Sequence, residues 1–444
     1  MFKEKYINEL DSFALSKDFK AETIALLQQK QQKYVCPNTV VPSKRSVFRP
    51  VFKKTAIAFA CAALVLLSVQ TIRFYRGTSM SAGSEMQSFT INDVQSLDDG
   101  TKAGTSPCFF IEADYDSGSG FGYEGILLKD IGQYDNGNPF SIYDSFDSLP
   151  VYRFNPPDIE QAEKETHQLL NALAADSSTA KTKITLTEIV YQDGHVSTHR
   201  DTVVSAEEFT RIKLKEPIVP HIYETEFDGG SIQMWLPRGE TRITADIDAV
   251  PGGTQLVDYI AQNYSAALGY DNGIVCTDTD YNIYGEENPT YYIYNHSEDY
   301  AQNLFNYSVN NARVYYSPRE ESLEEYDQFI LWAKSDCYTR GEELPAINWQ
   351  QALGLLYEGD YYSSVPYDIT DETVVSRIEL MYKPAPYNSM TLTSSRLSLP
   401  FYKFYVNIEE MDIKEKGLED YGIYYVCAID PAYIEITDNY AQFN

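Results

Sequence analysis

The segment FYKFYVNI, residues 401–408, carries the strongest indication of β structure in the chain. Aromatic and β-branched side chains follow one another in it, which favours a strand. Two further runs of this kind, 377–382 and 422–429, lie on either side of it in the sequence. Asn348 and Gln351 have the spacing of a helix N-terminal cap. The last hundred residues therefore predict a helix packed on an antiparallel sheet.

The preceding part of the chain alternates strand-like runs with polar turns. Asp193-Gly194 separates two such runs, 183–191 and 196–204, and predicts a hairpin because both turn positions tolerate positive φ. Asp158 and the apolar residues after it predict a helix. The other expected elements are a short helix after Ser205, a helix over 254–268, and Tyr-rich strands at 291–295, 312–317 and 326–333.

One short internal similarity suggests a repeat. LPVYRF at 149–154 matches LPFYKF at 399–404 in four of six positions and has Lys for Arg at a fifth. The two segments would then be the same strand in two related units. We therefore expect an α+β fold of antiparallel sheets with packed helices, divided into two units at 106–235 and 236–444.

Charge is distributed unevenly along the chain. Residues 1–54 contain 11 Lys/Arg and 5 Asp/Glu, a net charge of +6, whereas residues 73–444 contain 24 and 60, a net charge of −36. Between them, TAIAFACAALVLLSVQTI at 55–72 has no charged residue and as a helix would be about 27 Å long, close to the hydrocarbon thickness of a bilayer. The pattern predicts a single transmembrane helix, with a cleaved signal peptide and a buried core helix as alternatives.

Basic residues on both flanks of this run predict its orientation. Lys53 and Lys54 end a strongly basic N-terminal flank, whereas Arg73 and Arg76 are the cations on the other side. The positive-inside rule then places the N-terminus in the cytoplasm and the acidic C-terminal part outside the cell. The segments around the span are a short helical segment (1–34), a basic linker (35–54) and a flexible spacer (73–105).

The N-terminal segment has an apolar stripe that consists of Phe19, Ile24, Leu26 and Leu27. Some thirty residues are too few to form a core of their own. We therefore expect these side chains to bind a cytoplasmic partner, such as a sigma factor or another signalling protein. The alternative is a basic stalk that holds to anionic membrane lipid.

Motifs of catalysis or cofactor binding are absent from the sequence: it has no nucleophile elbow, phosphate loop or dinucleotide fingerprint. His195 and His199 could share one face of a strand, but no third zinc ligand is evident. Asp278, Asp280 and Asn282 alternate as calcium ligands do, although the glycine and the closing glutamate of a calcium loop are missing. We expect no catalytic residue, cofactor or metal, and calcium binding stays open.

The net charge and the tyrosine and cysteine contents bear on three further questions: nucleic acid as a partner, sugar-binding surfaces and disulfides. The net charge of −30 argues against nucleic acid as a partner. The 37 tyrosines suit half-exposed sheets, with sugar-stacking surfaces as the alternative. Four cysteines follow the apolar run, and they permit two disulfides in any of three pairings or free thiols: Cys108, Cys276, Cys337 and Cys427.

Residues 345–437 resemble the PepSY-like and YycI-like extracytoplasmic regulatory domains of Gram-positive bacteria. The resemblance lies in the helix with Ala352, Leu355 and Leu356, in LPFYKFYV at 399–406 and in YYVCAID at 424–430. It implies a domain that restrains or tunes a sensor kinase or a protease. The N-terminal layout, with FKEKY at 2–6 and a helix over 17–32, is similar to that of membrane-anchored anti-sigma factors of Firmicutes.

These features together predict a non-enzymatic, single-pass membrane regulator or sensor. In this interpretation an acidic extracytoplasmic domain binds a ligand and the N-terminal segment holds a cytoplasmic partner. The alternative is a membrane-anchored binding module for cell-wall or peptide ligands, and an extracytoplasmic enzyme is the third hypothesis. The sequence does not indicate the identity of the ligand or the oligomeric state.

Overall fold

The structure is a computed structural model, and its described residues all belong to the unit formed by residues 80–444. They are residues 88–95, 108–109, 123–173, 175, 177–192, 195–247, 269–270, 273–316, 327–334, 337–385, 387–388, 392–394, 397–434 and 437–438.

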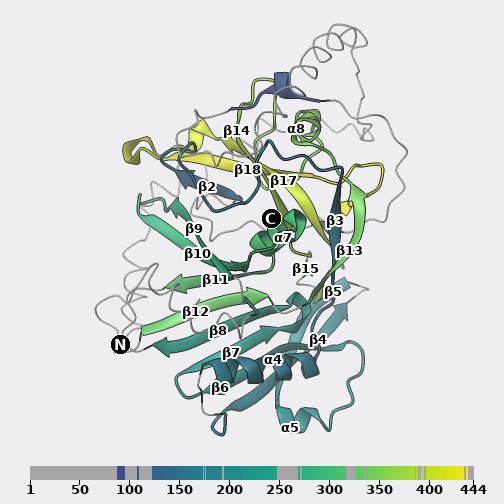
Figure 1. The fold of residues 1–444 in the computed structure, drawn as a ribbon. Helices are drawn as coiled ribbons and strands as arrows, with labels where there is room; N and C mark the ends of the chain where they lie inside the picture. Colours follow the sequence, from purple (N-terminus) through teal and green to yellow (C-terminus); the bar gives the residue numbers. More distant parts are fainter. Residues whose placement is uncertain are drawn as a thin grey trace, which may run out of the picture. The chain divides into compact units, whose positions relative to one another are not determined.

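A nine-stranded antiparallel sheet is built from the middle of the chain (Figure 1). From edge to edge its strands are β5 (His195–Ser205), β4 (Lys181–Gln192), β6 (Ile218–Phe227), β7 (Gly230–Trp235), β8 (Glu240–Ile247), β12 (Asp327–Lys334), β11 (Asn311–Tyr316), β10 (Glu287–Asn295) and β9 (Gly273–Tyr281). The hairpin of β4 and β5, which pairs Ile189 with His199, confirms the prediction made from Asp193-Gly194.

A six-stranded antiparallel sheet combines strands from both ends of the described region. Its strands are β13 (Tyr338–Pro345), β3 (Ser148–Phe154), β17 (Leu397–Asn407), β18 (Glu419–Cys427) and β2 (Gly125–Leu128), with β14 (Val375–Lys383) also paired to β17. Strand β17 is central, because β14 and β18 pair with it on its two sides over residues 399–407 and β3 pairs with its first two residues. The similar segments 149–154 and 399–404 therefore lie in two paired strands of one sheet.

Small elements complete the described structure. They are the parallel pair β1 (Cys108–Phe109) and β19 (Thr437–Asp438), the pair β15 (Tyr387–Asn388) and β16 (Thr393–Ser394), and the 3-10 turns η1 (Ile91–Asp93), η2 (Leu236–Arg238), η3 (Glu409–Met411) and η4 (Lys414–Lys416). Phe89, within the stretch expected as a spacer, is buried and bridges to Val375.

Four α-helices occur in the described residues: α4 (Ile159–Ala172), α5 (Ala206–Phe209), α7 (Tyr300–Ser308) and α8 (Trp349–Glu358). Helix α4 packs its buried face on the nine-stranded sheet, where Ile232 and Met234 belong to the same apolar core (Figure 1). Helices α7 and α8 belong to the core of the six-stranded sheet. Within it the ring of Phe305 stacks on that of Tyr152, with centroids 3.6 Å apart.

Several helix starts follow the predicted local chemistry. The Asp158 carboxylate accepts a hydrogen bond from Gln161 N at the start of α4. Asn348 and Gln351 form a reciprocal capping box at the start of α8, and Ser205 begins α5 in the same way with Glu208. These contacts involve residues close in sequence, which is why the pattern predicted them.

The predicted fold class is wrong. The described structure is mainly β, formed by antiparallel sheets with few helices, and is not an α+β fold behind a transmembrane helix. Within the described ranges no helix is long and apolar enough to span a bilayer, so the single-pass description is withdrawn. The run 55–72 itself lies outside those ranges. The α+β prediction failed because strands β6 to β9 and β13 gave no recognised signal.

Candidate functional site

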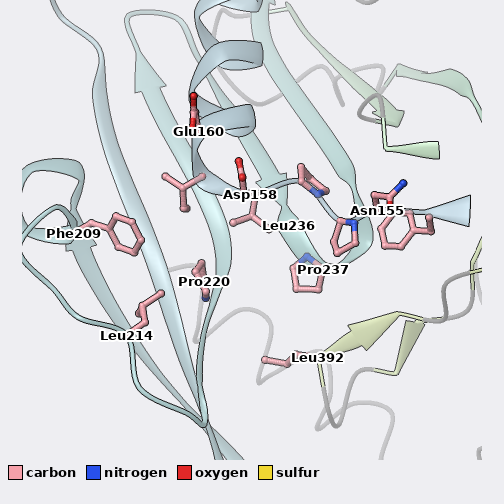
Figure 2. A pocket seen from close by; sticks show the side chains of 13 residues that line it. Asn155, Asp158, Glu160, Phe209, Leu214, Pro220, Leu236, Pro237 and Leu392 are labelled. Atoms are coloured by element: carbon pink, nitrogen blue, oxygen red, sulfur yellow. The ribbon is translucent and has the colours of Figure 1, made fainter. Parts of the chain in front are cut away.

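A cavity of about 740 Å³ lies at the N-terminal end of α4 (Figure 2). This size falls in the range of small-ligand and side-chain pockets, about 300–1,000 Å³. The residues that line it come from the end of β3, the start of α4, the end of α5 and the segment after it, and the β6, η2 and β16 regions: Phe154, Asn155, Pro156, Pro157, Asp158, Ile159, Glu160, Phe209, Leu214, Pro220, Leu236, Pro237 and Leu392.

Proline shapes much of this wall. Pro156 and Pro157 connect β3 to the cap of α4, Pro220 lies in β6, and Pro237 lies in η2. Proline fixes φ and has no N–H group, so these four positions are rigid and offer no backbone donor to a ligand. The cavity is therefore preformed and mainly apolar.

Two carboxylates give the cavity its charge. Asp158 Oδ1 accepts a hydrogen bond from Gln161 N at 2.8 Å, and Glu160 follows in the first turn of α4. Both acids lie at the positive end of the helix dipole, which favours them there. No Lys, Arg or His side chain is among the lining residues. The site can hold an apolar group beside a cationic one.

The lining set does not contain the side chains of a Ser–His or Cys–His nucleophilic pair. It has no Ser, Cys, Thr or His, and its one capping carboxylate is already engaged with the backbone of α4. A nucleophile and a base within hydrogen-bond reach of each other are the minimum for that chemistry. The cavity is suited to binding.

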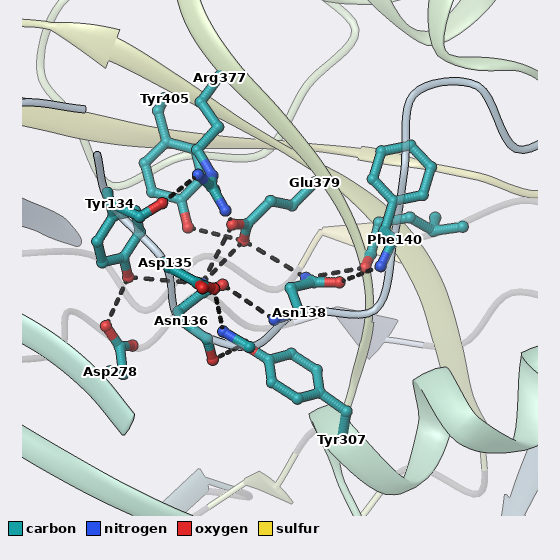
Figure 3. A network of polar contacts seen from close by, with 12 residues as sticks. Tyr134, Asp135, Asn136, Asn138, Phe140, Asp278, Tyr307, Arg377, Glu379 and Tyr405 are labelled. Carbon is teal, nitrogen blue, oxygen red and sulfur yellow. Dashed lines mark hydrogen bonds and ion pairs between the residues drawn. The ribbon is translucent and has the colours of Figure 1, made fainter. Parts of the chain in front are cut away.

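A buried polar network lies elsewhere, around Glu379 of β14 (Figure 3). The Glu379 carboxylate is 3% exposed and accepts hydrogen bonds from Arg377 Nε at 2.7 Å, Tyr405 OH at 2.8 Å and Asn136 Nδ2 at 3.1 Å. A buried carboxylate needs such partners, since an unpaired charge in the interior is costly.

The network continues from the six-stranded sheet to the nine-stranded sheet. Arg377 donates to the backbone oxygen of Tyr134 at 2.6 Å, and Tyr134 OH donates to Asp278 Oδ1 of β9 at 2.7 Å. Tyr307 OH of α7 donates to the backbone oxygen of Asn136 at 3.1 Å. These bonds connect β14, the loop before β3, α7 and β9, so the network holds the two sheets together.

The two carboxylates of the network have opposite pKa shifts. Burial by itself would raise the pKa of Glu379, but the nearby Arg377 and Lys403 outweigh it and the pKa is lowered. Burial raises the pKa of Asp278, and the hydrogen bond from Tyr134 offsets this only in part. Diverging pKa values are found in acid–base catalysts.

The enzyme hypothesis would place its chemistry at this pair of carboxylates. Neither carboxylate lines the cavity, and both are closed in by side chains that already donate to them. We therefore interpret the network as a structural junction between the sheets.

Most of the site residues predicted from the sequence lie outside the residues that the structure describes. The partner-binding residues and the basic flanks of the apolar run lie outside the described residues: Phe19, Ile24, Leu26, Leu27, Lys53, Lys54, Arg73 and Arg76. His195 and His199 lie on β5, and the described residues contain no cluster of three or more potential metal-ligating side chains. Of the proposed calcium ligands, Asp278 is instead engaged by Tyr134.

Of the two alternatives left open for the cysteines, two disulfides or thiols, the structure does not contain the two disulfides. Cys276, Cys337 and Cys427 are not in disulfides, so Cys108 has none of them as a disulfide partner. Burial raises the pKa of Cys276 and of Cys427 to about 12. Both thiols therefore stay protonated at neutral pH and are poor nucleophiles.

Sequence reasoning missed both the cavity and the network. The run Phe154 to Asp158, with two prolines directly before a helix cap, was the signal that could have indicated a rigid wall. No local signal indicates the network, because Asn136 and Glu379 are 243 positions apart.

No protein-family model matches the chain, and neither the curated proteins nor the solved structures include a significant match to it.

Proposed function

We propose that this chain is a regulatory binding protein whose cavity beside α4 binds a peptide segment with an apolar side chain next to a basic residue. The observation that carries the proposal is the residue composition of the cavity wall. Ten of its thirteen residues are apolar, two are acidic, and none is a cation. An apolar side chain would fill the cavity, and a lysine or arginine beside it would face Asp158 and Glu160.

The preformed wall supports such binding energetically. Rigid prolines lose little conformational freedom when a ligand enters, so less of the contact energy is spent on ordering the site. The negative charge of the two acids mainly orients the peptide and speeds its association with the cavity, and it contributes less to the affinity itself. A strongly acidic C-terminal part, with a net charge of −36 over residues 73–444, would attract basic segments in the same way.

Fluorescence anisotropy with labelled hexapeptides tests the proposal on the full chain. The panel places Leu or Phe next to Lys, and a matched panel replaces Lys by Glu. We expect saturable binding of the Lys panel alone. Asp158→Asn keeps the helix cap, because Asn caps as well as Asp, and together with Glu160→Gln it should weaken binding about tenfold.

The matched control is Glu163→Gln, which removes an exposed acid of the same helix that does not line the cavity. It should leave the affinity unchanged. Equal binding of the Lys and Glu panels, or an equal loss in the control, would contradict the proposal.

A second candidate function concerns the N-terminal segment. The stripe of Phe19, Ile24, Leu26 and Leu27, together with the net charge of +6 over residues 1–54, favours a protein partner such as a sigma factor. The test is a pull-down with residues 1–54 beside a Phe19→Asp, Leu27→Asp variant. Recovery of one protein that the variant loses would support it, and equal recovery by both would contradict it.

A further inference from the structure

A continuous row of side chains crosses one face of the nine-stranded sheet. The register of six successive strands, β6, β7, β8, β12, β11 and β10, places these residues directly opposite one another: Glu224, Gln233, Arg242, Trp332, Arg313 and Tyr292. Side chains directly opposite each other in antiparallel strands point to the same face. The buried residues Ile232, Ile243 and Leu331 alternate with the row and face the α4 core on the other side.

The row alternates guanidinium groups with aromatic rings. Arg242 Cζ lies 5.7 Å from the ring centroid of Trp332, and Arg313 Cζ lies 5.4 Å from that of Tyr292. The ring of Trp235, two residues along β7 from Gln233, stacks on Trp332 with centroids 5.1 Å apart and an interplanar angle of 24°. Trp332 and Arg242 are half-buried, whereas Arg313 is exposed.

Arg242 has unused hydrogen-bonding capacity. Its Nε is shielded from solvent and has no hydrogen-bond partner among the described residues. Cationic groups of this kind favour anions, and a guanidinium pairs with a carboxylate through two parallel bonds. The row is therefore a local cationic and aromatic surface on a chain with a net charge of −30.

We propose that this row, together with Trp235, is a binding site for an acidic saccharide, with pyranose rings against the tryptophans and carboxylates at the two arginines. Arg242 and Arg313 lie on β8 and β11, which are separated by β12 alone, so the two strands are about 10 Å apart. A carboxylate on one sugar and a second one further along the same chain can then engage both arginines while a ring between them covers Trp332.

The other members of the row favour a saccharide over single-stranded nucleic acid. Glu224 and Gln233 lie on the same face and are hydrogen-bonded to each other, with Gln233 Nε2 donating to Glu224 Oε1. Their other side-chain oxygens are acceptors, and sugar hydroxyl groups are the donors that such acceptors need. A phosphodiester backbone has no donor to give them, and Glu224 would repel it. Bases do stack on aromatic rings, so a nucleic acid is the competing outcome of the test.

Titration of the full chain with short oligogalacturonates tests the proposal through tryptophan fluorescence. Two of the three tryptophans, Trp235 and Trp332, belong to the site, and the third, Trp349, packs on Phe89 in the other core. We expect saturable quenching that survives in Trp349→Phe and is strongly reduced in Trp332→Phe. Methyl-esterified oligogalacturonate, which lacks the charges, should bind at least tenfold more weakly.

Variants of the arginines separate binding from folding. Arg242→Gln and Arg313→Gln should each weaken binding about tenfold. Arg200→Gln, an exposed arginine on β5 paired with Glu188, is the matched control and should bind as the unchanged protein does. No quenching with the unchanged protein, equal binding of the methyl ester, or tighter binding of oligothymidylate than of oligogalacturonate would each overturn the proposal.

Discussion

Replacing Asp420 by Asn should remove most of the pH dependence of stability between pH 5 and pH 8. Asp420 in β18 is fully buried, and its Oδ1 accepts a hydrogen bond from Tyr123 OH at 2.9 Å. Its Oδ2 has no partner among the described residues, and the Asp412 carboxylate lies close by, accepting a bond from Asp420 N at 3.0 Å. Burial, with a smaller contribution from Asp412, raises the pKa of Asp420 to about 7.

The magnitude follows from the difference between the folded and unfolded pKa. A rise from 3.8 to about 7 is about three units, or about 4 kcal/mol as an upper bound at about 1.4 kcal/mol per unit. Because the folded pKa is the higher one, the folded state holds the proton while the unfolded state has lost it. The stabilisation is therefore complete below about pH 4 and is lost as the pH rises through about 7.

Urea unfolding followed by circular dichroism at pH 5, 6, 7 and 8 measures the effect. The free energy of unfolding of the unchanged protein should fall over this range, and that of Asp420→Asn should fall by up to about 3 kcal/mol less, since about two of the three units lie above pH 5. Asp368→Asn, at an exposed position, is the control and should keep the original slope. Parallel curves for the unchanged protein and Asp420→Asn would refute the reasoning.

Three further changes test the packing described above. Glu379→Ala should destabilise the protein by about 3 kcal/mol because it removes the buried partner of Arg377, a half-buried cation, and thermal unfolding that shifts no more than for an exposed glutamate would contradict this. Gly137→Ala should cost more than about 1 kcal/mol, since Gly137 has φ +75° and an added Cβ would lie 2.6 Å from Cys276 Cβ; adding Cys276→Gly should restore only part of the loss. Asp158→Ala should lower the free energy of unfolding by about 1 kcal/mol, whereas Asp158→Asn should leave it almost unchanged, because only Asn keeps the cap. Urea unfolding measures both variants, and equal losses would argue against the cap.

The predictable part of the fold was local. Asp193-Gly194 predicted the β4 and β5 hairpin, and Asn348 with Gln351 predicted the start of α8, because the groups that interact are within a few residues of one another. The same holds for Asp158 and α4. Each of these signals is a hydrogen bond or a turn conformation that a short peptide already specifies.

The remaining part depended on contacts between distant residues. Strand β17 pairs with β3 in one sheet, although the similar sequences of the two strands suggested separate units. The sequence analysis did not predict helix α7, although Asp299 caps it. The buried face of this helix is filled by contacts with residues far away in the sequence, such as that of Phe305 with Tyr152, and a local pattern does not reveal them. The cavity has the same origin, since its wall joins Phe154, Leu236 and Leu392 from three parts of the chain.

Hydrogen exchange of the full chain, with and without a bound Lys-containing hexapeptide, tests the central claim most directly. The account predicts that the peptide slows exchange in segments 154–160 and 209–220, which line the cavity, and leaves β17 and β18 unchanged. Slower exchange confined to other segments, or no change at saturating peptide, would contradict the assignment of the cavity as the binding site.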